Sequence, residues 1–233
     1  MKILAIESSA KAASVAIVED GKILGEAFLN CGLTHSVTVM PSVEWLLGMA
    51  NLKISDIDRI AITEGPGSFT GLRIGMAAVK GLAWACDIPC CGVSTLECAA
   101  TGVAHIDGII CAAMDARANQ VYNALFLADE GTLTRLSEDR AITIPELLEE
   151  LEEYENVILV GDGALLLDEK SEGKYTLAPE HIRYQRAVYA AYLAESAEAV
   201  SAQELRPEYI RLPQAERERI ERLKAEKVES IKV

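Results

Sequence analysis

Apolar and polar residues follow two different periods along the first 100 residues. Apolar runs at 2–7, 14–19 and 22–29 are typical of strands, and Asp20-Gly21 between the second and third runs predicts a tight hairpin. Apolar residues at helical spacing predict helices over about 36–50 and 70–86, on either side of a buried strand at 58–63. A short strand near 88–94 and a helix that begins at Thr95 complete this part of the chain.

The order of these elements is βββαβαβα, which is that of an RNase H-like lobe. The pattern partly repeats, with strands at 108–114, 121–127, near Leu133 and at 156–160, and with a helix over 146–154 that follows the capping box Thr143-x-x-Glu146. We therefore predict an α/β fold of two RNase H-like lobes, each a mixed β-sheet with helices, as in the actin-like ATPases (the ASKHA superfamily). The first lobe spans residues 1–100, and a smaller, reduced second lobe spans 101–213.

Two segments near the carboxyl end stand apart from this repeat. An amphipathic helix at about 186–201 is expected to pack back on the first lobe. Residues 214–233 alternate in charge sign and carry little apolar surface, so the sequence predicts a frayed helix or a disordered tail there.

Charge and composition restrict the possible functions. The 233 residues include 36 acidic and 22 basic side chains, which gives a net charge of −14. Because phosphate contacts dominate nucleic-acid affinity, a chain this acidic is not expected to bind RNA by itself. The sequence shows neither a signal peptide nor a membrane span. Six cysteines, all in apolar surroundings and without C-x-x-C spacing, favour a reduced, cytoplasmic protein with inert core thiols, and we assign no role to the adjacent Cys90 and Cys91.

The most distinctive motif is the glycine-rich stretch G-P-G-S-F-T-G-L-R-I-G at residues 65–75. A strand, a glycine-rich turn and a helix N-terminus form a natural anion site, because unpaired backbone N–H groups point towards it. The spacing fits neither a P-loop nor a dinucleotide-binding fingerprint. Gly65, Gly67 and Ser68 remain candidate anion-binding residues, but we interpret the turn mainly as the start of a helix of small residues.

No catalytic or metal centre is predicted. A histidine pair that binds a metal needs helical spacing, and the three histidines, at 35, 105 and 181, lie far apart. Ser68 lacks G-x-S-x-G surroundings, so it is interpreted as a helix cap rather than a nucleophile. Asp115 and Arg117 are expected to pair with each other or with nearby backbone, in a structural role.

The helices at 36–50 and 70–86 have apolar residues on more than one side, which predicts that each helix packs against other elements on two of its sides. Small residues would also let another helix approach closely. We predict that one face of each helix joins a like-folded partner in a four-helix contact. The alternative is that both are core helices of a large lobe. The predicted contact residues are His35, Val39, Val43, Leu46, Gly71, Gly75, Ala78 and Leu82.

Six short motifs occur in order along residues 1–213. They are Ile6-Glu7-Ser8-Ser9, the stretch 65–75, Val93-Ser94-Thr95-Leu96-Glu97, Asp115-Ala116-Arg117 with Val121-Tyr122, Gly161-Asp162-Gly163, and Pro207-Glu208-Tyr209-Ile210-Arg211. Together they closely resemble the TsaB (YeaZ) family. The chain departs from the family pattern at Glu7, where aspartate is general, at Val37, where glutamate is usual, and at Asn119-Gln120, which replaces Gly-Glu.

The resemblance implies a role in forming N6-threonylcarbamoyladenosine at position 37 of tRNAs that read ANN codons. It implies a non-catalytic subunit that binds and activates the homologous transferase TsaD, together with the ATPase TsaE, and that meets tRNA only through the complex. Without TsaD, the same helix face is expected to form a homodimer. No cofactor is expected to be required by the chain alone.

A second hypothesis is a free-standing actin-like ATPase or acyltransferase that acts on a small substrate. Glu7 and Ser8 after the first strand, and Gly161 and Gly163 after the strand at 156–160, could form the nucleotide loops of such an enzyme. The second loop is equally compatible with an ordinary tight turn. Weak binding of ATP or ADP, at the junction of the complex, is the most that we expect.

Overall fold

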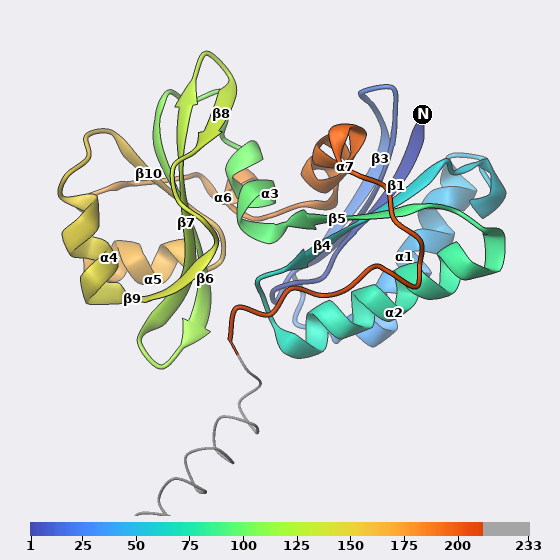
Figure 1. Cartoon of the computed structure of the whole chain (residues 1–233), viewed down its shortest axis with the longest axis horizontal. Coiled ribbons are helices and arrows are strands. Elements are labelled where there is room, and N and C mark those ends of the chain that lie inside the picture. Colours follow the sequence, from blue (N-terminus) through green and yellow to red (C-terminus); the bar gives the residue numbers. More distant parts are fainter. Residues whose placement is uncertain (212–233) are drawn as a thin grey trace, which may run out of the picture.

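The computed structural model describes residues 1–211, so the predicted tail at 214–233 lies outside the described residues. Two α/β lobes lie side by side, each built on one mixed sheet (Figure 1). This arrangement confirms the predicted fold class of two RNase H-like lobes. Of the helices within residues 1–211, none has the length and apolar character needed to cross a membrane.

The first lobe has the predicted order of elements. Its strands are β1 (Lys2–Glu7), β2 (Ala13–Glu19), β3 (Lys22–Leu29), β4 (Arg59–Gly65) and β5 (Cys90–Ser94), in the spatial order β3-β2-β1-β4-β5. β1 pairs antiparallel with β2 and parallel with β4. The hairpin between β2 and β3 turns at Asp20 and Gly21, which both have positive φ, as this tight turn requires.

Helices cover both faces of the first sheet. α1 (His35–Met49) and α2 (Phe69–Cys86) pack on Leu4 and Ile6 of β1, whereas Ile3 and Ala5 of the same strand pack on α7 (Ala187–Ser196). Successive residues of a strand point to opposite faces, so an apolar β1 must be buried on both sides. The helix expected at 186–201 is therefore α7, and it lies on the first lobe. The short helix η1 (Ile54–Asp56) leads into β4.

The second lobe contains two strands that the sequence did not predict. β6 (Gly108–Arg117), β7 (Gln120–Asp129), β8 (Thr132–Arg135) and β10 (Val157–Val160) match predicted strands, and the sheet order is β11-β10-β6-β7-β8. β9 (Arg140–Thr143) also pairs with β7, and β11 (Thr176–Leu177) adds an edge to β10. Both additional strands are short and only partly buried, so their sequences lack a clear apolar pattern.

Three longer helices complete the second lobe. α4 (Ile144–Leu151) begins at the predicted capping box of Thr143 and Glu146, and with α5 (Ala164–Lys170) it covers one face of the sheet. α3 (Thr95–Thr101) covers the other face, and α6 (Glu180–Arg183) is a single turn before α7. The chain then returns past α2 towards the space between the lobes (Figure 1).

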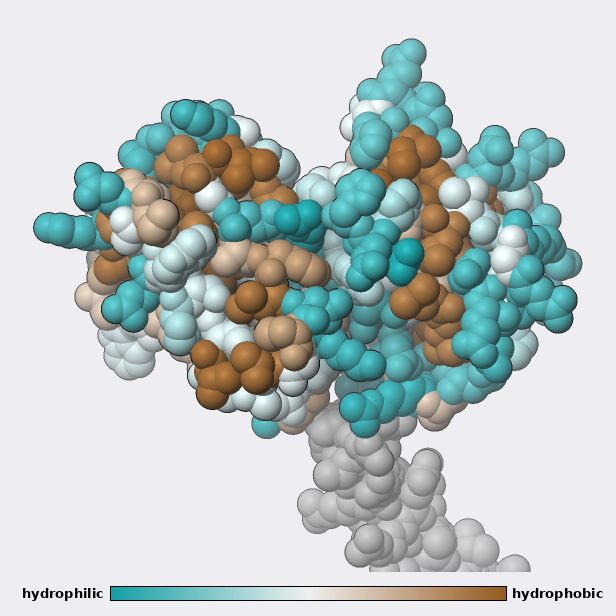
Figure 2. Space-filling model, turned by 180° about the vertical axis from the view of Figure 1, so that it is seen from behind, coloured by the Kyte–Doolittle hydropathy of each residue, from teal (hydrophilic) through white to brown (hydrophobic). Residues whose placement is uncertain are grey.

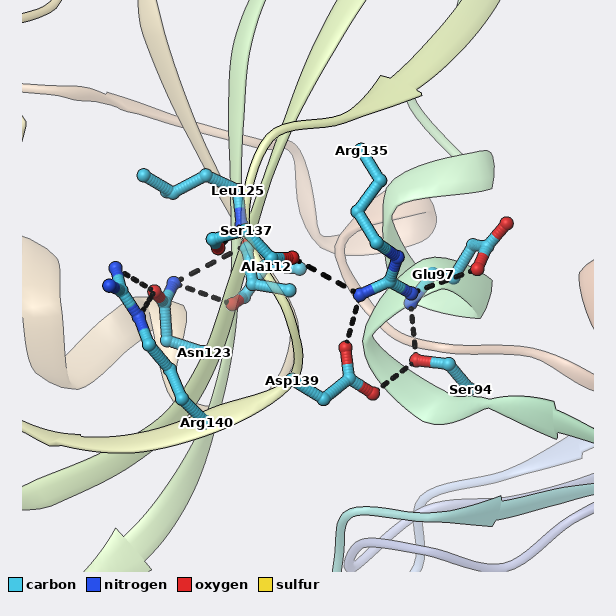
Figure 3. A network of polar contacts seen from close by, with 10 residues as sticks. Ser94, Glu97, Ala112, Asn123, Leu125, Arg135, Ser137, Asp139 and Arg140 are labelled. Carbon is cyan, nitrogen blue, oxygen red and sulfur yellow. Dashed lines mark hydrogen bonds and ion pairs between the residues drawn. The ribbon is translucent and has the colours of Figure 1, made fainter. Parts of the chain in front are cut away.

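Polar contacts at α3 connect the lobes (Figure 3). The hydroxyl of Ser94 caps α3 by accepting from the N–H of Glu97, and it donates to Asp139 of the second lobe over 2.6 Å. The Arg135 guanidinium donates to Glu97 at 2.9 Å and to Asp139 at 2.5 Å. These partly buried groups therefore satisfy one another where β5 of the first lobe leads into α3.

Candidate functional site

A cleft of about 460 Å³ lies between the lobes. It is lined by residues 9–11, which follow β1, by residues 66–70 at the start of α2, by residues 114–117 at the end of β6 and by residues 208–211, together with Tyr122 and Asp162. The ends of strands from both sheets therefore meet here, which is where open α/β sheets bind ligands. The cleft is the first candidate site.

The glycine-rich turn packs against the protein's own first loop. The N–H of Ser68 donates to the carbonyl of Ser9 over 2.6 Å. A Cβ on Gly67 would lie 2.6 Å from that same carbonyl oxygen, and a Cβ on Gly65 would lie 2.2 Å from the carbonyl oxygen of Glu208. The glycines are needed because neighbouring backbone comes too close for a side chain. The expected anion cradle is therefore partly filled by the chain itself.

Ser68 has the expected capping role. Its side chain accepts a hydrogen bond from the N–H of Gly71 at the first turn of α2, over 3.3 Å. No base contacts its hydroxyl among the hydrogen bonds of residues 1–211. Ser68 lines the cleft as a cap and not as an activated nucleophile.

The small residues of α2 allow its close approach to β1. A Cβ on Gly71 would lie 2.1 Å from the carbonyl oxygen of Ser8, whereas a Cβ on Gly81, in the same helix, would have no atom within 4 Å.

We predict that Gly71→Ala lowers the free energy of unfolding by about 2 kcal/mol, because the backbone must move to make room for the methyl group. Gly81→Ala should raise it by about 0.5–1 kcal/mol through helix propensity. Urea unfolding of both variants measures the contrast, and equal effects would show that the close contact is unimportant.

Gly161 and Gly163 form a tight turn that packs on β6. The N–H of Gly161 donates to the carbonyl of Arg183 over 2.7 Å, and the N–H of Gly163 donates to that of Ala113 over 3.0 Å. A Cβ on either glycine would lie less than 3 Å from the backbone of β6. Because both N–H groups already have partners within the chain, neither is available to a nucleotide.

Glu7 is completely buried where β1 ends. Its Oε1 accepts hydrogen bonds from the backbone and hydroxyl of Ser9 and, at 3.3 Å, from Thr63, while its Oε2 has no partner among residues 1–211. Burial raises the pKa of Glu7 to about 7, and the negative charge of Asp162 adds to this, against the opposing effect of the Ser9 and Thr63 hydrogen bonds. Near neutral pH this carboxyl group is therefore about half protonated.

Two further carboxylates belong to the second-lobe side of the cleft. Burial raises the pKa of Asp162 to about 6, with a further contribution from the charge of Asp115, while Lys11 opposes both. Asp115 accepts a hydrogen bond from the N–H of Arg117 over 2.7 Å. This is the contact to nearby backbone expected for the pair, and it fixes the turn between β6 and β7.

The candidate nucleotide-binding residues are only partly accessible from the cleft. Of the candidate nucleotide residues, Gly67 and Ser68 line the cleft, whereas Glu7 and Ser8 are fully covered. The hydroxyl of Ser8 donates to the carbonyl of Gly71 over 3.0 Å, so it is occupied within the fold. Within residues 1–211 there is also no cluster of three or more His, Cys, Asp or Glu side chains suited to a metal ion.

The cysteines are only partly in the core. Cys90, Cys91, Cys98 and Cys111 are buried, whereas Cys31 and Cys86 are exposed, which corrects the prediction that all six lie in apolar surroundings. Burial raises the pKa of both Cys90 and Cys91 to about 11, so these thiols stay protonated and unreactive at neutral pH.

Most of the predicted partner residues lie on the sheet-facing side of their helices. Val39, Val43 and Leu46 are buried against the first sheet, and Gly71 and Gly75 contact Ser8. Ala78 and Leu82 pack at the edge of the same core. His35 is also buried, and its Nε2 lies 2.7 Å from the carbonyl oxygen of Ala10. The six buried residues stabilise the lobe itself, whereas Ala78 and Leu82 remain partly exposed.

The outward sides of α1 and α2 nevertheless present an apolar surface, which we call the outer helix face. Its large exposed residues are Val37, Met40, Trp45, Met49 and Trp84. Glycine and alanine residues lie among them on the exposed side, namely Gly48, Ala77, Gly81 and Ala85. Hydrophobic surface is visible over the first lobe, on the left of Figure 2. The sequence signal for this face was the presence of tryptophan and methionine between the inward-facing positions.

A groove of about 510 Å³ adjoins the outer helix face between α1 and the edge strand β3. Phe28, Leu29, Val37, Pro41 and Trp45 are among its lining residues. Single exposed apolar residues are normal, but several large ones on two neighbouring helices beside a groove are typical of an interaction surface. This face is the second candidate site.

Comparisons with known proteins agree with the motifs. The family model of the transferase TsaD, tRNA N6-adenosine threonylcarbamoyltransferase, matches residues 30–217. The "tRNA threonylcarbamoyladenosine biosynthesis protein TsaB" of Bacillus subtilis is 34% identical over 228 residues, 95% of this chain and 99% of the relative. The TsaB protein of Escherichia coli is 38% identical over 152 residues, 64% of this chain and 65% of the relative. The structure of YeaZ from Pseudomonas aeruginosa has a TM-score of 0.73 and 25% identity, and the match covers 89% of this chain and 99% of that one.

Proposed function

The chain belongs to the TsaB family of tRNA threonylcarbamoyladenosine biosynthesis proteins, and from this premise we propose that it is a non-catalytic subunit that binds and activates the transferase TsaD. The ATPase TsaE completes the complex, and tRNA is modified by the transferase. The family model of the transferase matches most of this chain, so the two proteins are homologous and share a fold. A partner of the same fold can offer two helices of its own.

The outer helix face is the observation that carries this proposal. Trp84 is 77% exposed, Met49 is 70% exposed and Trp45 is 55% exposed, although these side chains are strongly apolar. Tryptophan and methionine are enriched in the buried cores of protein–protein interfaces. Gly48 and Gly81 leave space beside them, because a Cβ on either would have no atom within 4 Å. A pair of partner helices can therefore approach closely and form a four-helix contact.

Few charges oppose such a contact. Glu44 is the one acidic residue of α1, and Arg73 and Lys80 are the charged residues of α2. The adjoining groove at β3 is lined mostly by apolar side chains and can receive an apolar side chain of the partner. In the absence of the transferase, a second copy of the chain covers the same face and forms a symmetric homodimer.

The cleft supports a non-catalytic role. The N–H groups of Ser68, Gly161 and Gly163, which could grip phosphates, donate within the chain, and no base contacts the Ser68 hydroxyl within residues 1–211. We propose that the chain alone needs no cofactor, and that ATP or ADP bound by the complex is held mainly by the other subunits.

Reconstitution tests this function. Purified chain, cognate transferase and ATPase are mixed with ATP, an activated threonylcarbamoyl donor and unmodified tRNA, and threonylcarbamoyladenosine is measured by mass spectrometry of the digested tRNA. Full activity is expected with all three proteins, and background activity when this chain is omitted. Equal activity without the chain would refute the activating role, and tight ATP binding by the isolated chain in calorimetry would favour the free-standing enzyme instead.

A further inference from the structure

Two aromatic rings and an arginine form a stack beside the cleft. The rings of Phe69 and Tyr209 have centroids 4.8 Å apart, and the guanidinium carbon of Arg73 lies 3.7 Å from the centroid of Phe69. Arg73 Nε also donates to the Tyr209 hydroxyl over 3.2 Å. Tyr209 remains 37% exposed, so part of its ring is open to a further stacking partner.

The segment that carries Tyr209 is fixed to both lobes. The N–H of Glu208 donates to the carbonyl of Glu64 over 2.7 Å, next to Gly65, where a side chain would not fit. On the other side of the cleft, Arg211 Nη1 donates to the carbonyl of Ala116 over 2.8 Å. The aromatic stack is therefore held in place by backbone contacts before any ligand arrives.

Basic side chains line the cleft beside this stack. Lys11, Arg117 and Arg211 belong to the lining, and neither Lys11 nor Arg117 forms an ion pair with any of residues 1–211. Three carboxylates share this lining: Asp115, which accepts a hydrogen bond from the Arg117 backbone, the mostly buried Asp162, and the exposed Glu208. The lining therefore balances its three cations with three carboxylates, whereas the whole chain has a net charge of −14.

We propose that this basic–aromatic rim, formed by Lys11, Phe69, Arg73, Arg117, Tyr209 and Arg211, contacts a single-stranded segment of the tRNA that the complex modifies. Aromatic rings stack on bases regardless of sequence, and neighbouring Lys and Arg side chains bind phosphates. The inference rests on the proposed function, because the acidic chain alone gives weak affinity and the transferase supplies the rest. A free nucleotide has the same chemistry, and the experiment separates the two sources.

The test is fluorescence anisotropy with labelled, unmodified tRNA, on the full chain alone and on the chain bound to its transferase, at several salt concentrations. The double variant Lys11→Glu/Arg117→Glu should weaken binding about tenfold or more and make the salt dependence shallower. Tyr209→Ala should weaken binding about fivefold to tenfold through the lost stacking, whereas Tyr209→Phe should bind as the wild type does. Lys22→Glu/Lys170→Glu, at two exposed positions outside the cleft, is the charge-matched control and should have no effect.

Complex formation is measured separately by light scattering. The rim variants should still bind the transferase, since the outer helix face is intact, so loss of RNA binding alone supports the rim. The inference is overturned if all rim variants bind tRNA within about twofold of the wild type in both preparations. It is also overturned if ATP displaces tRNA from the chain alone, because the rim would then be a nucleotide site. If the wild-type chain fails to bind the transferase, the proposed function is refuted. The tRNA binding of the isolated chain and its rim variants then still tests whether the rim contacts tRNA.

Discussion

Trp84→Glu is expected to weaken binding of the chain to its transferase by about 100-fold or more, because a central aromatic anchor is lost and a charge is buried in its place. Trp84 is 77% exposed in the isolated chain, so the substitution should leave the free energy of unfolding nearly unchanged. Titration calorimetry with the purified transferase measures the affinity, and urea unfolding measures the stability.

Leu165→Glu is the matched control for this experiment. Leu165 is also an exposed, large apolar residue, but it lies on α5 of the second lobe, away from the outer helix face. It should bind the transferase as the wild type does. If Leu165→Glu abolished binding and Trp84→Glu did not, the interface would lie on the second lobe and the proposed contact would be wrong.

Glu7→Gln is expected to stabilise the chain at and above neutral pH. The pKa of Glu7 is raised from 4.5 to about 7 by burial, so the folded state prefers the protonated carboxyl group. That contribution to stability is fully present below pH 4.5 and is lost as the pH rises through about 7. The wild type therefore loses about 3 kcal/mol of unfolding free energy as Glu7 ionises, whereas the glutamine variant, which cannot ionise, keeps its stability over this pH range.

Urea unfolding of both proteins at a series of pH values checks this expectation. The difference in the free energy of unfolding between Glu7→Gln and the wild type should grow in favour of the variant from pH 4.5 to about 7.5 and then stay constant. Other titrating groups are common to both proteins, so the difference isolates Glu7. If the difference did not vary with pH, the pKa of Glu7 would be the same in the folded and unfolded states, which would contradict the prediction.

Much of the first lobe could be predicted because its elements bury themselves in simple patterns. β1 is apolar on both faces, Asp20-Gly21 has one favourable turn conformation, and Thr143 with Glu146 marks a helix start. β9 and β11 could not be predicted, because they are short, only partly buried and depend on pairing with β7 and β10, which lie elsewhere in the sequence.

The choice of helix face failed for a geometric reason. At about 100° per residue, Gly71 and Leu72 lie on adjacent sides of α2 and not on opposite ones. The apolar residues on both of these sides can therefore face the sheet. The outward side begins with Arg73 and continues through Gly81 to Trp84. Sequence periodicity shows that a helix has two apolar sides, but only the position of the sheet decides which one is left exposed.

The glycine-rich motif shows a similar limit. Its glycines could equally admit a phosphate or a neighbouring backbone, since both require the absence of a side chain. The carbonyls of Ser8 and Ser9 take up that space in this fold. The glycines in the sequence show that something packs closely against the turn. The group that does so belongs to a loop more than 50 residues away, which the motif itself does not indicate.

The central claim is that the outer helix face binds the transferase, and the two tryptophans of the chain, Trp45 and Trp84, both lie on that face. The most direct measurement is the ¹⁹F NMR spectrum of the chain labelled with 5-fluorotryptophan, titrated with unlabelled transferase. Both resonances should shift, and their dependence on the H₂O to D₂O ratio should fall as solvent is excluded from the indoles. Two resonances that stay unchanged while the complex forms would contradict the claim.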